Sequence, residues 1–117
     1  MNGQHLQRAH LLMELCNARE TGVLGALAGQ LRTMGLANTL GWLAQKSNGQ
    51  SRDSQAAGDL LKHLWSELRP AALADLAPQQ AAQGIDGLPR ATLLQLERRA
   101  LHLIQAIDLD FRTRKDP

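Results

Sequence analysis

The scarcity of side chains that favour β-sheets is the feature that most constrains this fold. The 117 residues include three Ile, one Val, one Phe and no Tyr, whereas Leu, Ala, Gln and Arg are abundant. Sheets favour branched and aromatic side chains, while Ala, Leu, Gln and Arg lose little entropy on entering a helix. The sequence therefore predicts an all-α fold. Since domains commonly contain about 100–150 residues, we expect one compact bundle of five to six helices.

Apolar residues recur at three- and four-residue spacing in the N-terminal part of the chain. This spacing predicts a first helix from about Gln4 to Glu20, with Cys16 on its apolar face as a small buried residue. A break at Gly22 should precede a second helix over residues 23–33. Gly25 and Gly29 lie four residues apart in that helix, and we expect them to let another helix approach closely.

Gly35 interrupts the pattern, and a third helix is expected to follow it and to end near Lys46. After a polar loop comes the clearest apolar stripe in the chain, in a helix that Pro70 should end. Its members are Ala57, Leu60, Leu61, Leu64, Trp65 and Leu68. We expect this stripe to form the centre of the core.

The remainder of the chain should hold one short helix and one long helix. Residues 71–90 are rich in Ala, Gln, Gly and Pro, and a short helix is predicted around Leu73–Ala82. Pro89 suits the first position of a final helix, which is expected to end at Ile107 or Phe111. The predicted organisation is a single helical domain over residues 1–111 followed by a polar tail over 112–117.

Charge is distributed unevenly although the net charge is only +2. Residues 1–52 carry five basic and two acidic side chains, residues 53–89 two basic and five acidic, and residues 90–117 six basic and four acidic. Basic ends around an acidic middle suit a protein that touches a polyanion on one side and a protein partner on another. Chance clustering on a solvated surface is the alternative interpretation.

Residues that would support catalysis are poorly supplied. The four histidines (His5, His10, His63 and His102) have no metal-ligand spacing, and Cys16 is the only cysteine. No nucleophile, phosphate-loop or dinucleotide-binding motif occurs. We therefore expect a protein that is not an enzyme and that holds no cofactor and no metal. The absence of a signal-like or membrane-spanning run predicts a cytoplasmic protein without membrane contact.

The residues disfavour two modes of nucleic-acid recognition, base stacking and base reading by a helix-turn-helix. Trp42 and Trp65 fall on or beside apolar stripes, so we expect both in the core and no base-stacking platform. A helix-turn-helix around Gly35 would expose Asn38, Thr39, Gln45 and Lys46, but the intervening Leu and Trp residues leave little polar surface to read bases. Phosphate contacts by Arg and Lys remain the favoured mode.

The block Met34-Gly35-Leu36-Ala37-Asn38-Thr39-Leu40-Gly41-Trp42-Leu43, followed by Lys46, resembles one family. Small subunits of type III-B (Cmr) CRISPR effector complexes have an Asn-Gly-Leu-type break before a helix that Lys closes. The chain departs from that pattern with Met34 in place of Asn and with Gly41-Trp42 in place of Ala-Phe. Gln7-Arg8-Ala9 and Leu93–Phe111 are weaker similarities, to the opening and closing helices of the family.

The resemblance implies a non-catalytic subunit that stacks into a short filament inside an RNA-guided complex. Its partners would be other effector subunits, copies of itself, and the guide and target RNA, contacted through phosphates. Position in the matching blocks makes Arg8 and Lys46 the leading RNA-binding candidates, and charge alone adds Arg32, Arg98 and Arg99. A stand-alone helical adaptor or a helix-turn-helix DNA-binding regulator is the alternative hypothesis.

Overall fold

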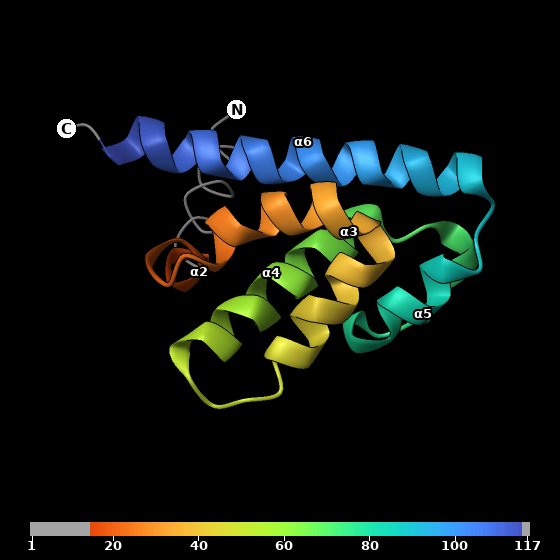
Figure 1. Ribbon diagram of the computed structural model, residues 1–117, viewed down its shortest axis with the longest axis horizontal. Helices are drawn as coiled ribbons and strands as arrows, with labels where there is room; N and C mark the ends of the chain where they lie inside the picture. The colour runs from red at the N-terminus through yellow and green to blue at the C-terminus, as the bar shows by residue number, and fades with distance from the viewer. Residues whose placement is uncertain (1–14, 116–117) are drawn as a thin grey trace.

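Helices account for most of the computed structural model, which describes residues 15–115 (Figure 1). The described part of the chain contains no strand, and the predicted all-α bundle is confirmed. The α-helices are α2 (Cys16–Glu20), α3 (Val23–Lys46), α4 (Arg52–Leu68), α5 (Ala81–Asp86) and α6 (Arg90–Lys115). Two short 3₁₀ turns, η1 (Ala71–Leu73) and η2 (Pro78–Gln80), lie between α4 and α5.

Helix α3 is the centre of the bundle and packs against α4, α5 and α6. Figure 1 shows α6 lying along one edge of the molecule, with the first half of α3 next to it. The second half of α3 turns away from α6 and runs between α4 and α5. The two ends of α3 therefore belong to different surfaces of the protein.

The core is built mainly from leucine. All six members of the stripe predicted for α4 are buried, among them Trp65, whose side chain is only 2% exposed. The indole N–H of Trp65 donates a hydrogen bond to the carbonyl of Leu76, 2.8 Å away. A buried tryptophan usually needs a partner for this polar group. The bond also holds the chain between η1 and η2 against α4.

The predicted break at Gly35 is confirmed as a sharp kink inside α3. Gly35 has φ +80° and ψ 171°, a backbone conformation that is essentially restricted to glycine. Such a break leaves backbone N–H groups without helical partners. The carboxylate of Glu97, on α6, accepts a hydrogen bond from the N–H of Leu36 at 2.8 Å. Glu97 therefore caps the second half of α3 from a different helix.

Removing this cap should cost stability. We expect Glu97→Ala to lower the free energy of unfolding by about 0.5–2 kcal/mol, as other losses of N-terminal helix caps do. Glu97→Gln keeps an acceptor oxygen and should cost less. Urea denaturation of both variants tests this, with Arg98→Ala on the exposed surface of α6 as the control. Equal stability of Glu97→Ala and Arg98→Ala would contradict the capping role.

The N-terminal helix differs from its prediction in the part that is described. Helix α2 spans only Cys16–Glu20, and residues 4–14 of the predicted helix lie outside the described residues. The prediction that Cys16 is buried is wrong, since its thiol is exposed. Leu15 and Ala18 are buried instead. At about 100° per residue, Cys16 points about 100° away from Leu15 and about 160° away from Ala18, so it faces away from the buried side.

The expected close approach of a helix at Gly25 and Gly29 is also wrong. Both glycines are exposed, and no described residue comes within 4 Å of a Cβ atom built on either one. The buried residues of this part of α3 are Val23, Leu24, Leu27 and Leu31. The glycines lie on the other side of the helix and face solvent.

Two element boundaries in the C-terminal half differ from their predictions. No helix spans Leu73–Ala82, because Pro78 lacks the N–H that a continuous helix needs there; the chain instead forms η1, η2 and α5. Helix α6 continues past Phe111 to Lys115, into the segment predicted as a polar tail. Phe111 is buried, and Arg112 forms an ion pair with Asp108 one turn earlier, at 3.0 Å.

Candidate nucleic-acid interface

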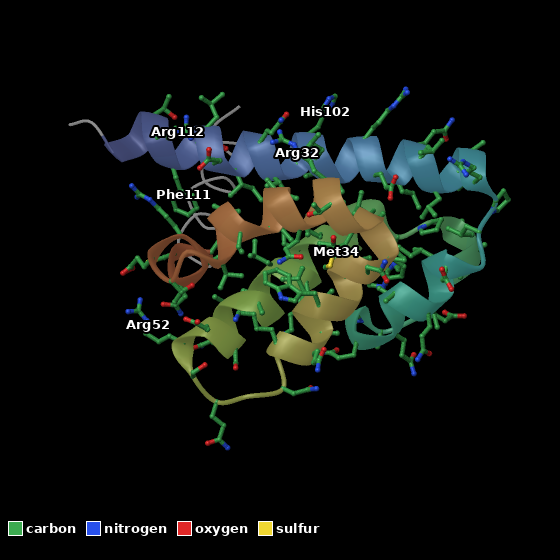
Figure 2. The ribbon with its side chains drawn as sticks, in the orientation of Figure 1. Arg32, Met34, Arg52, His102, Phe111 and Arg112 are labelled. Atoms are coloured by element: carbon green, nitrogen blue, oxygen red, sulfur yellow. The ribbon has the colours of Figure 1, made fainter. Side chains whose placement is uncertain are left out.

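Three of the five predicted RNA-binding residues are exposed side chains near the α6 edge. Arg32 lies on the first half of α3, and Arg98 and Arg99 lie on α6. Figure 2 shows Arg32 reaching from α3 to the level of α6. Arg98 and Arg99 are consecutive, so their side chains leave α6 about 100° apart. Arg8 lies outside the described residues.

These three arginines are among the exposed basic residues that form no ion pair with a described acidic side chain, as are Lys62, Arg69 and Arg90. By contrast, Arg52 pairs with Glu20 at 3.2 Å and also donates a hydrogen bond to the Asn17 side chain at 2.9 Å. Since an ion pair already satisfies part of an arginine's charge, the arginines near α6 are better suited to bind an external anion.

Lys46 lies on a different surface from the other candidates. It ends α3, and Figure 1 shows this end of the helix far from α6. Its side chain is 33% exposed, with Nζ 4.0 Å from a carboxylate oxygen of Asp53. Nζ also lies 5.8 Å from the ring centre of Trp42. The described candidates therefore form no single cluster, because the kink at Gly35 directs the two halves of α3 to different sides.

The acidic middle of the sequence forms a separate part of the surface. Residues 53–89 build α4, η1, η2 and α5; Figure 1 shows the start of α4 and all of α5 away from α6, while the end of α4 approaches it. Asp53, Glu67, Asp75 and Asp86 are exposed there. The charge asymmetry of the sequence is thus also an asymmetry in space, with exposed arginines near α6 and exposed carboxylates along α4 and α5.

Trp42 is less enclosed than predicted, although one side of it packs against the core. It is only half-buried, whereas Trp65 is fully enclosed, so the expectation of two core tryptophans holds for Trp65 alone. Trp42 lines a groove between the second half of α3 and α5. The groove also contains Met34, which is 38% exposed and lies near the middle of the view in Figure 2.

A second helical stripe accounts for this groove. Leu36, Leu40 and Leu43 face the core, while residues 34, 37, 38, 41, 42 and 45 follow helical spacing along another side of the same segment. The sequence analysis expects Trp42, which lies on this second side, in the core. A short helix with apolar residues on two of its sides usually buries only one of them, and this pattern could have indicated that Trp42 lies at the surface.

The helix-turn-helix alternative loses one of its four reading positions. Thr39 is only 1% exposed, and its hydroxyl donates a hydrogen bond to the carbonyl of Gly35 at 2.7 Å. The expectation that it faces outward is wrong, because Thr39 lies on the same side of the helix as Leu36 and Leu43. Asn38 and Gln45 are exposed, but both line the groove next to α5.

The exposed Cys16 thiol is held in its protonated form. Its Sγ donates a hydrogen bond to the carboxylate of Glu20, 2.9 Å away. This bond and the negative charge of Glu20 raise the pKa of Cys16 above its ordinary value, despite the opposing effect of Arg52 and Arg19. A raised pKa lowers the fraction of reactive thiolate.

The described residues contain no group of three or more His, Cys, Asp or Glu side chains arranged to hold a metal ion. No helix among them is long and apolar enough to cross a membrane. The comparisons with known proteins leave the family open, since no family model, curated protein or solved structure matches the chain.

Proposed function

We propose that this chain is a non-catalytic small subunit of a type III-B CRISPR effector complex, in which it helps to hold guide and target RNA. The observation that carries the proposal is the group of exposed arginines near α6 (Arg32, Arg98 and Arg99), none of which pairs with a described acidic side chain. Contacts of this kind bind phosphates without reading sequence. The cytoplasm is the proposed place of action.

The separation of charge supports stacking of identical subunits. Head-to-tail stacking is a heterologous contact, which needs two different and complementary patches on each copy. The arginines near α6 and the exposed carboxylates of α4 and α5 supply patches of opposite sign. Charge complementarity of this type speeds association and selects the partner surface. In an assembled filament, the arginines left outside the contact remain for RNA.

Lys46, a leading candidate from the family resemblance, tests a second RNA contact on another surface, at which the ammonium group would exchange its 4.0 Å pairing with Asp53 for a phosphate. Lys46→Ala should weaken capture of target RNA by the assembled complex for every target sequence, because a lost phosphate contact carries no base information. The slope of log affinity against log salt should become shallower by about 0.7–0.9. Filter binding over a salt series measures both quantities.

Lys62→Ala is the matched control, since Lys62 is an exposed lysine on the acidic helix α4. It should leave capture and its salt dependence unchanged. If Lys46→Ala and Lys62→Ala behave alike at every salt concentration, Lys46 is not a phosphate contact. Loss of capture for one target sequence only would point to base recognition instead.

A further inference from the structure

The outer line of α6 carries basic and uncharged side chains only. Residues 91, 95, 98, 102, 105, 109 and 112 follow helical spacing along this helix, and each of them is exposed. Arg98, His102 and Arg112 are the members of this line that can carry a charge. The three carboxylates of α6 lie on other sides of the helix and are only partly exposed (Glu97, Asp108 and Asp110). Glu97 is bonded to the N–H of Leu36, and Asp108 pairs with Arg112. The outer line therefore presents no carboxylate to an anionic ligand.

His102 lies in the middle of this line and next to two of the proposed RNA-binding arginines. Arg98 and Arg99 precede it by four and three residues, spacings at which side chains are neighbours on a helix surface. Arg99 and His102 also line the same hollow on the surface of α6. Figure 2 shows the His102 side chain on the side of α6 away from α3. The ring is therefore placed to contact the same ligand as the two arginines.

In the described part of the chain, the elements packed against α6 bring no carboxylate within ion-pair distance of His102. The first half of α3 has Arg32 as its only charged residue between Val23 and Met34. The end of α4, with Glu67 and Arg69, approaches the inner side of α6, which is opposite to His102. Helix α2 meets α6 at Phe111, more than two turns further along. A phosphate would therefore meet no competing anion at this ring.

Histidine responds to pH in a range where the neighbouring arginines do not. An imidazole ring gains a proton and a positive charge as the pH falls through about 6–7, whereas arginine stays charged. The neutral ring offers one N–H donor and the charged ring offers two. A bound phosphate favours the charged ring, so protonation of the ring and binding of the phosphate promote each other.

We infer that His102 is a further phosphate contact of the arginine surface near α6, and that RNA binds this surface more tightly as the pH falls from about 8 to about 5.5. The inference rests on the proposed function and adds a residue and a pH response to the same site. The contact carries no base information, since it is made to phosphate.

Fluorescence anisotropy with the full chain and a labelled uridine oligoribonucleotide tests the inference. The oligonucleotide has about ten nucleotides, which is within the range of known single-strand sites. Its affinity is measured in low salt at constant ionic strength, at about pH 8 and about pH 5.5. On acidification the unmodified protein should gain about two- to fivefold more affinity than His102→Gln does, which is the size of one exposed ion pair. The glutamine keeps a polar side chain but carries no charge at either pH.

Two further variants provide the matched controls. His102→Arg is charged at both pH values and should bind tightly at both. His63→Gln removes a half-buried histidine of α4 and should respond to pH as the unmodified protein does. Circular dichroism at both pH values shows whether each variant is folded. The NMR signals of the His102 ring need no variant as a readout, and the oligonucleotide should move their titration to higher pH.

The outcomes separate this inference from the proposed function. If the unmodified protein and His102→Gln gain equal affinity on acidification, the role of His102 is overturned, while phosphate binding by the arginines stands. Titration of the His102 ring at the same pH with and without bound oligonucleotide overturns it in the same way. If the oligonucleotide binds at neither pH in low salt, the inference is also overturned, and the proposed function is then judged by whether the chain co-purifies with a guide RNA.

Discussion

Replacing Trp65 with alanine is expected to lower the free energy of unfolding by about 3–5 kcal/mol, the usual range for buried tryptophan. Its side chain is only 2% exposed and packs in the centre of the leucine core. The substitution leaves a large cavity and also removes the hydrogen bond from the indole N–H to Leu76. Urea denaturation followed by circular dichroism measures the loss.

Trp42→Ala provides the comparison, because the same atoms are removed from a half-buried site. A core position for Trp42, as the sequence predicts, would make this substitution lower the free energy of unfolding by several kcal/mol. Because Trp42 is only half-buried, we expect a smaller loss. An open groove is already filled by solvent, so the Trp42 variant should lose clearly less stability than the Trp65 variant. Equal losses for the two variants would contradict the environments described above.

Replacing Gly35 with alanine should cost about 1–3 kcal/mol through backbone strain alone. The φ of +80° is unfavourable for any side chain, and the new Cβ atom would lie 3.0 Å from the Glu97 carboxylate oxygen. Contact at this distance pushes Glu97 away from the Leu36 N–H that it caps. Gly35→Val should be worse, since branched residues tolerate positive φ least. Urea denaturation again gives the measurement.

Gly25→Ala is a control that should have the opposite sign. Gly25 is exposed within the first half of α3, and no described residue lies within 4 Å of an added Cβ atom. Alanine in a helix interior is more favourable than glycine by up to about 1 kcal/mol. Stabilisation by Gly25→Ala together with destabilisation by Gly35→Ala supports the kink. Stabilisation by both substitutions would show that α3 is continuous.

Local patterns predicted the parts of the fold that depend on neighbours in the sequence. All six residues of the predicted α4 stripe are buried, because six apolar residues at helical spacing define one face of a helix without ambiguity. The break at Gly35 was also predictable, as glycine tolerates the backbone conformation required there. Glu97 was not found, because its role depends on the packing of α6 against a residue 61 positions earlier.

The missed features share one physical cause. Periodicity tells which residues share a face of a helix, but only packing decides which face another element covers. Residue spacing alone therefore could not predict that Cys16, Gly25 and Trp42 are exposed or partly exposed. Pro78 was a readable signal against a helix over residues 73–82, since proline disfavours helix interiors.

The sequence predicted which basic residues are exposed but not where they lie relative to one another. Arg32, Arg98 and Arg99 were chosen for charge, and each is exposed; their contact with RNA stays a prediction. The location of Lys46 on another surface depends on the angle at Gly35 and on how α5 packs against α3. Neither the angle nor the packing can be read from residue spacing.

The measurement that tests the central claim most directly is purification of the tagged full chain from its own cells, with sequencing of the nucleic acid that accompanies it. The account predicts larger effector subunits and short guide RNAs in the same fraction. A variant with Arg32, Arg98 and Arg99 all replaced by glutamate should lose that RNA. Purification of the chain without RNA or larger subunits, or together with a specific DNA duplex, would contradict the account.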